Sequence, residues 1–481
     1  MVQTELIKPM RLSRIITVDK NKCVNCHQCI AACSTKYANN GFGDTVEVND
    51  NLCIGCGECI KACSHEARIP VDDFEAAMIA IQNKEKVIAL VAPAIATNFP
   101  QKYLNINGWL KTIGVSALFD VSFGAELTIK SYLNHITSNK PKTVISQPCP
   151  AIVTYIEVYK PELLPFLAPA DSPMMHTIKM IREFYPKYND HKIIIVSPCL
   201  AKKREFEEVG AGDYNVTMNS LENYIEQQNV DLKKYPEVGF DNDSAERAVL
   251  FSTPGGLLST AERDFRPIRN VTRKIEGPHT IYPYLDSLYE QIELGRAPLL
   301  IDCLNCEKGC NGGTGTTKKD SAVDELEFHI NERRKHQQER YKTDNEAVES
   351  ITSLQTIISK YWKKGLYDRD YINRSELFTT SIKIPSEQQF DSIYKEMHKY
   401  SEKDIINCSS CGYNSCEMMA TAIHNNLNKP ENCHFYMSHI NQEKAEELNQ
   451  HNLKLHEQKM ELIEQSENLL LSIEKIRNFT K

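Results

Sequence analysis

Long apolar runs and an excess of positive charge are both missing from this sequence. No run of 18 or more apolar residues occurs, although a membrane-spanning helix needs about that length. Met1 to Met10 has no apolar core of signal-peptide length. Basic residues number 56 against 64 acidic ones, so the formal net charge is −8 at pH 7. We therefore expect a cytoplasmic protein with no membrane span and no nucleic-acid partner.

Cysteine, in contrast, is abundant, with 17 residues in a chain of 481. Reducing compartments keep thiols free, so many cysteines without a secretion signal favour metal binding over disulfides. The cysteines gather in an N-terminal block, a C-terminal block and three separate segments between them. We expect all but one of them to bind metal.

The N-terminal block contains an internal duplication within residues 18–70. The spacing C-x2-C-x2-C-x3-C occurs twice, as in bacterial ferredoxins, where the fourth cysteine of each run binds the other cluster. We therefore assign one 4Fe-4S cluster to Cys23, Cys26, Cys29 and Cys63, and a second to Cys53, Cys56, Cys59 and Cys33. Ser34 and Ser64 replace the usual proline after the fourth cysteine, and a zinc knuckle is the alternative.

From residue 74 to about 380 the pattern is α/β. Apolar, β-branched runs at 86–91, 142–145, 192–196 and 298–301 alternate with helical stretches such as 175–185. In α/β sheets, ligands bind at the carboxyl ends of strands. The segments that follow the four runs are Ala92-Pro93-Ala94, Pro148-Cys149-Pro150, Pro198-Cys199 and the loop from Cys303 to Gly313. The pattern predicts that cysteines from three distant segments share one site.

The loop from Cys303 to Gly313 holds three cysteines and three glycines. Glycine lets the backbone approach an inorganic core and aim N–H groups at its sulfurs. The alternative is a glycine-rich turn with incidental thiols. Further along, the nearly continuous polar stretch from Asn331 to Glu349 predicts a solvated helix.

The C-terminal block consists of Cys408, Cys411, Cys416 and Cys433, with a helical pattern at 417–423 between the last two. This compact group suits a 4Fe-4S cluster, and a structural zinc is the alternative.

A tail from about His439 to Arg477 has no glycine or proline. An apolar residue recurs every seven positions, at Leu448, Leu455, Leu462, Leu469 and Ile476. This spacing predicts a coiled coil that forms a homodimer, although polar Asn452, Lys459 and Ser466 stand at the partnering positions. The alternative is an amphipathic helix on the protein's own surface.

The arrangement of cysteines resembles that of the FeFe hydrogenases, in which two ferredoxin repeats precede four further cysteines, here Cys149, Cys199, Cys306 and Cys310. Ser146-Gln147-Pro148-Cys149-Pro150 is similar to the family motif T-S-C-C-P. The segment from Ser197 to Glu205 is similar to M-P-C-x-x-K-K-x-E, and the one from Cys306 to Gly313 to a shortened C-x-x-G-C-x-x-G-G-G. Flanking segments at 92–95 and 119–129 also fit, so the resemblance covers residues 1 to about 380.

The resemblance implies the family's H-cluster. A 4Fe-4S cubane would be held by Cys149, Cys199, Cys306 and Cys310, with Cys310 bridging to a di-iron subsite that carries CO, cyanide and a dithiolate. Lys202 would donate to a cyanide, and Ala92, Pro93 and Ala94 would line the other side. Met174, near the position of an expected Gln, together with Gly312 and Gly313, completes the expected cofactor-binding set.

Several positions depart from the family pattern. Catalytic members carry a proton-transferring cysteine where Pro148 stands, and proline has no titratable group. Ser197 replaces a methionine. Cys303 is off-pattern, and either substitutes in proton transfer or is a buried, inert thiol. The Cys408 module resembles that of sensory FeFe hydrogenases and a small Fe-S domain whose final alanine is Ala420 here.

Together these features predict a multidomain α/β protein. We expect a ferredoxin-like head at 1–73, an α/β FeFe-hydrogenase core at 74–385, a 4Fe-4S module at 386–438 and a coiled-coil tail at 439–481. The implied function is a regulatory hydrogenase of low activity that takes H2 and protons and serves a redox or signalling partner. The alternatives are a catalytic ferredoxin-type hydrogenase with a rerouted proton path, and a cluster-assembly scaffold, against which Lys202 and Ala92-Pro93-Ala94 count.

Overall fold

The computed structural model describes residues 11–341 and 347–479. The segment from Met1 to Met10, which entered the signal-peptide argument, lies outside these ranges. The chain forms two compact units, the first made of Met1–Asn40 and Asp44–Ile382 and the second of Gly41–Gly43 and Lys383–Lys481. A search of the described residues found no helix with the length and apolarity needed to cross a membrane.

The N-terminal part of the first unit is built on the two cysteine runs. Strand β1 (Ile16–Val18) pairs antiparallel with β4 (Arg68–Pro70), and β2 (Asn39–Asn40) pairs with β3 (Glu47–Val48). Each run carries a single helical turn, α1 (Gln28–Ala31) or α2 (Glu58–Lys61). The duplication in the sequence is therefore also a duplication in the backbone.

The rest of the first unit contains two parallel sheets. One has the order β6-β5-β8-β9 (Leu118–Asp120, Val87–Val91, Lys192–Ser197 and Tyr214–Thr217), and the other has the order β10-β11-β7 (Thr272–Glu276, Leu300–Leu304 and Val144–Ile145). The four strands expected from the sequence are present. They divide between the two sheets, however, because β5 pairs with β8 and β7 pairs with β11.

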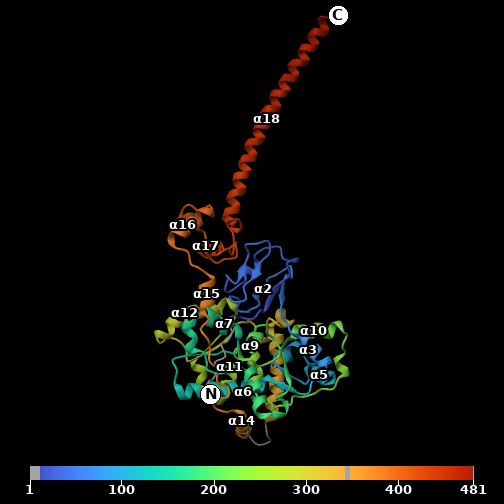
Figure 1. The fold of residues 1–481 in the computed structure, drawn as a ribbon, viewed down its shortest axis with the longest axis vertical. Helices are drawn as coiled ribbons and strands as arrows, with labels where there is room; N and C mark the ends of the chain where they lie inside the picture. The colour runs from blue at the N-terminus through green and yellow to red at the C-terminus, as the bar shows by residue number, and fades with distance from the viewer. Residues whose placement is uncertain (1–10, 342–346, 480–481) are drawn as a thin grey trace, which may run out of the picture. The chain divides into compact units, whose positions relative to one another are not determined.

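Helices cover both sheets (Figure 1). Their bounds are α3 Phe74–Gln82, α4 Ile95–Asn98, α5 Tyr103–Ile113, α6 Val121–Asn139, α7 Pro150–Tyr159, α8 Pro173–Phe184, α9 Lys202–Val209, α10 Met218–Gln227, α11 Gly256–Asp264, α12 Pro278–Glu293, α13 Val323–Tyr341, α14 Ala347–Tyr361 and α15 Ser375–Ser381. Helices α6 and α8 pack closely, since a Cβ on Gly124 would lie 2.2 Å from the Pro173 carbonyl oxygen. All five residues of β5 are buried in the main core. The parallel strands are thus held between packed helices.

The prediction of a solvated helix over Asn331–Glu349 is wrong for α13. Arg333 and Gln337 are buried. Arg333 Nη2 lies 2.6 Å from Asp120 Oδ2, and Nη1 donates to the Pro93 carbonyl at 3.1 Å. An ion pair to a residue 213 positions away leaves no periodic signal in the sequence. Part of the predicted stretch, residues 342–346, lies outside the described residues.

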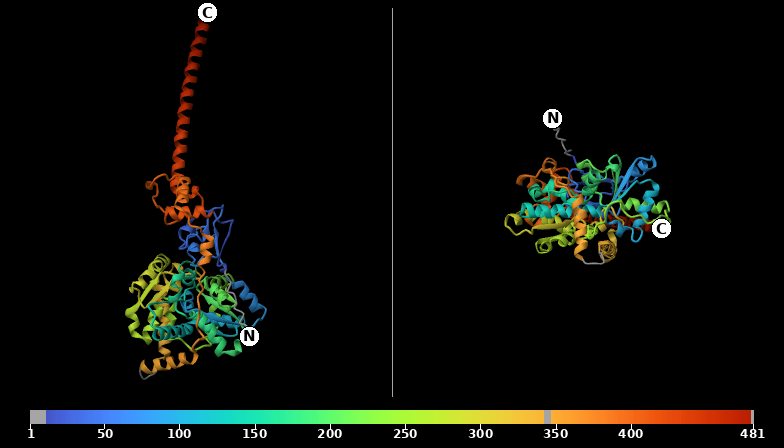
Figure 2. Two further views of the ribbon diagram at one scale, coloured as in Figure 1. Left: turned by 60° about the vertical axis from the view of Figure 1, so that its left-hand side comes forward. Right: turned by 90° about the horizontal axis from the view of Figure 1, so that it is seen from below.

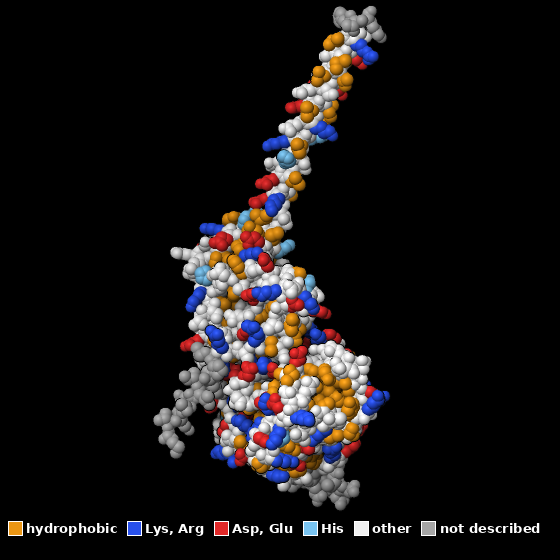
Figure 3. Space-filling view, turned by 45° about the vertical axis from the view of Figure 1, so that its right-hand side comes forward, with side chains coloured by type: hydrophobic (Ala, Val, Ile, Leu, Met, Phe, Trp, Pro, Cys, Tyr) orange, Lys and Arg blue, Asp and Glu red, His pale blue; other side chains and the backbone are white. Residues whose placement is uncertain are grey.

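The second unit consists of α16 (Glu387–Glu396), α17 (Cys416–His424) and the 46-residue helix α18 (His434–Phe479). Helix α17 packs against α16, and α18 continues without interruption (Figure 2). Apolar side chains are interspersed with charged ones along α18 (Figure 3). Its heptad leucines are 49–65% exposed and Ile476 is 66% exposed, unlike a helix packed on its own protein. Pairing of α18 with a second chain stays a prediction.

Candidate active site and iron-sulfur sites

One cavity of the first unit collects four cysteines from three distant segments. Cys149 precedes α7 just after β7, Cys199 follows β8, and Cys306 and Cys310 follow β11. The strand ends of both sheets therefore meet at this cavity. The structure brings together the four thiols that the resemblance assigned to a single cubane.

Most of the other expected residues line the same cavity. They are Ala92, Pro93, Ala94, Pro148, Met174, Lys202 and Gly313. Gly312 does not line it and faces a neighbouring pocket together with Cys306 and Lys308. Gly313 is needed where it stands, because a Cβ there would lie 2.4 Å from the Pro198 carbonyl oxygen. This contact packs the Cys310 loop against the Cys199 loop.

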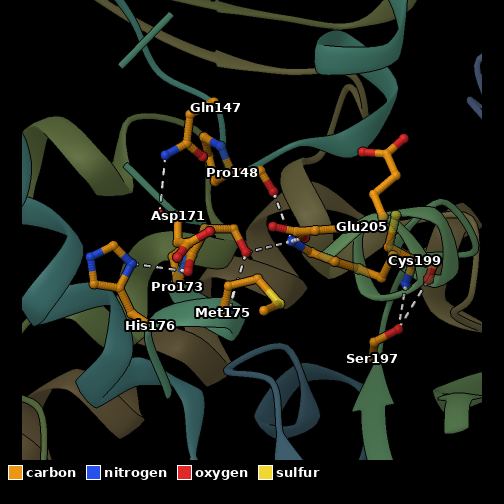
Figure 4. A network of polar contacts seen from close by, with 12 residues as sticks. Gln147, Pro148, Asp171, Pro173, Met175, His176, Ser197, Cys199 and Glu205 are labelled. Carbon is orange, nitrogen blue, oxygen red and sulfur yellow. Dashed lines mark hydrogen bonds and ion pairs between the residues drawn. The ribbon is translucent and has the colours of Figure 1, made fainter. Parts of the chain in front are cut away.

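Lys202 supplies a buried ammonium at the cavity. Its Nζ donates to the Pro148 carbonyl at 3.2 Å and to Ser172 Oγ at 3.1 Å, and it forms an ion pair with Glu205. Burial opposes the charge of Glu205, but Lys202 and Arg369 beside it hold the pKa of this carboxyl below its ordinary value. Figure 4 shows Pro148 and Glu205 joined in this network. The ammonium is thus compensated and fixed at the cavity wall.

Ser197, at the position of the family's methionine, organises the Cys199 turn. Its Oγ accepts from the Cys199 N–H at 3.3 Å and donates to Asn215 Oδ1 at 2.7 Å. Figure 4 shows Ser197 beside Cys199. A methionine could not make these bonds, so the turn is held here by polar contacts.

The thiols of this cavity are difficult to ionise by themselves. Burial, with Cys149 nearby, raises the pKa of Cys199 to about 11, while Lys202 opposes this rise. Burial and the neighbouring thiols of Cys149 and Cys199 raise the pKa of Cys310 to about 12. A buried thiolate needs a cation beside it. This donor set therefore fits a cationic iron core better than it fits four free thiols.

A second observation supports the fit of a polar group. Ser252, in a short 3-10 turn before α11, lines the cavity and is 3% exposed. Its Oγ has no hydrogen-bond partner among the residues that the structure describes. A buried hydroxyl without a partner is costly, and a polar ligand in the cavity would satisfy it. No motif in the sequence marks Ser252.

Cys303 is not among the residues that line this cavity. It is fully buried in β11, where its Sγ lies 3.7 Å from Ser146 Oγ, and burial raises its pKa well above the ordinary value. The interpretation as a buried thiol is confirmed by this position. A role for Cys303 in proton transfer gains no support from this position, because the thiol does not line the cavity.

The first ferredoxin-like site is a small pocket lined by Cys23, Cys26, Cys29 and Cys63. Arg68 also lines it and donates from Nη2 to Cys29 Sγ at 2.7 Å. Arg68 Nη1 is buried without a partner among the described residues. The pocket thus contains an unpaired N–H donor beside its thiols, and an inorganic sulfide bound there could accept a hydrogen bond from it.

The second ferredoxin-like site lies around Cys56. Burial raises the pKa of Cys56 well above the ordinary value, and the nearby thiols of Cys33 and Cys59 add to this. Burial also raises the pKa of Cys53, to which Cys33 contributes. The fourth cysteine of the first run therefore lies with the second run, as the ferredoxin spacing implies.

Two side chains that the motifs did not mark connect this second site to the part of the unit that carries the main cavity. Arg204, in α9, donates to the carbonyls of Ser13 at 3.1 Å and Asp50 at 2.9 Å and to that of Cys53. Asn305 Nδ2 lies 3.3 Å from the Cys56 carbonyl oxygen and 3.6 Å from Cys306 Sγ.

The amide of Asn305 is oriented by Tyr282, whose hydroxyl donates to Asn305 Oδ1 at 2.6 Å. With its oxygen held in this way, the amide directs its N–H groups to both cysteines. Asn305 therefore touches the second ferredoxin-like site and the main cavity at once.

In the second unit, Cys411, Cys416 and Cys433 are buried and Cys408 is exposed. Burial raises the pKa of Cys411, and the nearby thiols of Cys433 and Cys408 contribute. The N–H of Cys416 donates to Asn407 Oδ1 at 2.8 Å. This arrangement is compatible with a cluster or with a structural zinc.

Comparison with protein families gives two matches. Residues 85–314 match the iron only hydrogenase large subunit, C-terminal domain, and residues 15–64 match a 4Fe-4S dicluster domain. Iron hydrogenase 1 of Clostridium pasteurianum is 27% identical over 293 residues, which are 52% of this chain and 51% of that protein. Subunit HndD of the NADP-reducing hydrogenase of Solidesulfovibrio fructosivorans is 26% identical over 384 residues, 63% of this chain and 65% of that subunit.

The chain thus spans between half and two thirds of the length of these relatives. A solved [FeFe]-hydrogenase structure aligns with 63% of this chain and 100% of its own chain, with a TM-score of 0.48 and 17% identity.

Proposed function

Because residues 85–314 match the iron only hydrogenase large subunit, C-terminal domain, we propose that the chain is a hydrogen-binding regulatory FeFe hydrogenase. It activates H2 reversibly and slowly, and it passes the electrons through 4Fe-4S clusters to a redox or signalling partner in the cytoplasm. The four thiols of Cys149, Cys199, Cys306 and Cys310 would hold the H-cluster. When bound, this H-cluster supplies the redox chemistry of hydrogen.

The chain's own residues contribute positioning and a dry environment. Ser252 offers a hydrogen-bond donor to an anionic ligand such as cyanide, and the Lys202 ammonium, whose three N–H groups bind Pro148, Ser172 and Glu205, adds a positive charge beside it. Prolines, alanines, Val121 and Phe251 make up much of the remaining wall and exclude water, which strengthens those bonds. The unsatisfied hydroxyl of Ser252 and the buried ammonium of Lys202 both support this assignment.

The observation that carries the regulatory role is Pro148 at the cavity wall. Its ring has no proton to give, and its carbonyl accepts from Lys202. A proton donor at this position would speed each turnover, since positioned acid-base groups contribute 100-fold or more. Its absence supports slow turnover, which suits a sensor better than an enzyme that supplies or consumes hydrogen in bulk.

Substitution Pro148→Cys tests this role directly. We expect turnover of the fully matured protein to rise on the order of 100-fold. Pro148→Ala is the matched control, because it removes the proline ring without adding a thiol. Equal rates for the two variants would show that the missing donor does not limit turnover, and a parent rate of roughly 10 per second or more would favour the catalytic alternative.

The H-cluster itself is tested by infrared spectroscopy under inert gas and again under hydrogen. Carbonyl and cyanide bands that shift with hydrogen are the expected result. In Ser252→Ala we expect a cyanide band to shift because its donor is lost, whereas Ser259→Ala, on the neighbouring helix α11 and outside the cavity lining, should leave the bands in place. A filled cubane without any such bands would favour the scaffold.

Electron transfer would use the two ferredoxin-like sites and the Cys408 module. The support is the grouping of Cys23, Cys26, Cys29 and Cys63 in one pocket, and the position of Asn305 between Cys56 and Cys306. Metal analysis of the reconstituted chain tests the number of clusters. Zinc in place of iron at the Cys408 module would remove that module from the route.

A homodimer formed through α18 is the second part of this proposal. The exposed leucines of α18 recur every seven residues, and their burial in a coiled coil would remove them from water. Light scattering on the full chain and on a Leu455→Glu, Leu462→Glu variant tests this pairing. A monomeric parent would exclude it.

A further inference from the structure

Away from the iron-sulfur sites, three side chains of the second unit bring metal-ligating atoms together. His398 follows α16, and His439 and Glu443 lie one turn apart near the start of α18. One ligand atom from each residue lies within 4.8 Å of the other two. Two separate elements thus converge on one point.

His398 is fixed in place by its backbone and by neighbouring rings. Its φ of 57° is in the left-handed region, and its N–H donates to the Lys395 carbonyl at 3.0 Å. Its ring meets Tyr436 edge-on with centroids 4.8 Å apart, and the His439 ring at 5.2 Å. The turn after α16 therefore holds this imidazole against the first turns of α18.

His439 and Glu443 already have the spacing of two ligands. His439 Nδ1 lies 3.3 Å from Glu443 Oε1. Bonds of about 2.0–2.2 Å to a tetrahedral zinc put two ligand atoms about 3.3 Å apart. The third atom, on His398, lies within 4.8 Å of the other two, so the exposed side chains of His439 and Glu443 must turn toward it for all three to bind one ion.

We propose that His398, His439 and Glu443 form a binding site for a divalent first-row metal ion such as Zn²⁺. Two neutral imidazoles and one carboxylate carry a single negative charge, which suits a divalent cation. Nitrogen and oxygen donors of this kind are common zinc ligands. With three protein ligands, the ion keeps a position for water or for a group from a partner.

The consequence is a cross-link between the turn after α16 and the base of α18. The ion would fix the first turns of the long helix to the module that carries Cys416 and Cys433. Neither the hydrogenase chemistry nor the filling of the H-cluster is needed for this site. The alternative to a metal site is an ion pair between His439 and Glu443 in which His398 takes no part.

The test uses the full chain with its iron-sulfur clusters reconstituted first, so that cysteines are not free to take zinc. Zinc is then added, unbound zinc is removed, and bound zinc is counted by elemental analysis. Zinc-edge X-ray absorption gives the ligand type. We expect one zinc per chain with nitrogen and oxygen neighbours at about 2.0–2.1 Å and no sulfur near 2.3 Å.

His398→Asn and His439→Gln should each abolish this bound zinc. Asn tolerates the left-handed backbone of position 398, and Gln keeps the helix of position 439. His451→Gln, exposed on the same helix, is the matched control and should keep the zinc. Circular dichroism shows whether each variant is folded.

Three outcomes would overturn the site. They are a parent that retains no zinc, a sulfur shell around the zinc, and unchanged zinc in folded His398→Asn. The last result would leave only the ion pair on α18. As an independent readout, hydrogen exchange in the first turns of α18 should slow when zinc is added to the parent and not when it is added to His439→Gln.

Discussion

The two cysteine runs have identical spacing and different surroundings. In the first site Cys26 is exposed and Cys23 is half-buried, whereas in the second Cys56 and Cys59 are buried. At the same left-handed position before each helical turn, the first run has His27 and the second has Gly57, where a Cβ would lie 2.3 Å from Thr314. Spacing therefore decides which cysteines gather, and packing against the rest of the unit makes one site outer and the other inner.

The same contrast holds for the charged and polar groups at each site. Arg68 donates to the thiol of Cys29 in the outer site, while Arg204 and Asn305 bind backbone carbonyls of the inner one. In the outer site the charged side chain thus acts directly on a sulfur ligand. The inner site is attached through its backbone to the part of the unit that carries the main cavity.

Arg204→Met should have the largest effect, because it removes the attachment of the inner site. Three carbonyls, at Ser13, Asp50 and Cys53, lose their donor, and unpaired buried groups cost about 1–3 kcal/mol each. We expect a loss of roughly 3 kcal/mol in unfolding free energy by denaturant titration, together with iron loss from the inner site.

Glu207→Gln, half exposed on the same helix α9, is the control and should change stability by less than about 0.5 kcal/mol. Equal stability of the two variants would mean that the inner site is held by apolar packing alone.

Arg68→Gln should affect the outer site most, because Arg68 donates to the Cys29 thiol there and acts only electrostatically on the Cys59 thiol of the inner site. A cationic donor at a cluster sulfur stabilises the reduced, more negative state, so its loss lowers the reduction potential. We expect a shift of tens of millivolts, where about 59 mV is a tenfold change in the oxidised-to-reduced ratio for one electron. Redox titration followed by electron paramagnetic resonance measures it. A shift of the inner cluster instead would reverse the assignment of outer and inner sites.

Asn305→Leu should have the smallest effect. It should also lower a reduction potential, that of the cluster held by Cys306. A neutral N–H···S bond is weaker than a charged one, so we expect a shift smaller than that of Arg68→Gln. Asn305→Gln is the matched control, because a longer amide can still donate. If the leucine and glutamine variants titrate alike, the amide does not affect this potential.

The sequence predicted the parts of the site that depend on local pattern. The apolar runs that end at 91 and 145 end there as strands, while the runs predicted to end at 196 and 301 continue as strands to 197 and 304. These strand ends place the cysteine segments near one another. Asn305 and Cys56 are 249 positions apart, and Arg333 and Asp120 are 213 apart. A single sequence does not indicate such pairs, because each partner is a polar residue that belongs to no motif and no periodic pattern. Ser252 was missed for the same reason, since a lone serine in a turn is rarely notable.

The prolines around the cavity have a thermodynamic consequence. Pro148 and Pro150 flank Cys149, and Pro198 precedes Cys199. Each ring fixes φ and restricts the residue before it, so the unfolded chain has fewer conformations to lose at these positions. The entropy cost of ordering two of the four thiols, Cys149 and Cys199, therefore belongs mainly to folding and not to metal binding. A metal core that bound after folding would meet a preorganised half-site, and the ordering of the protein would reduce its affinity little.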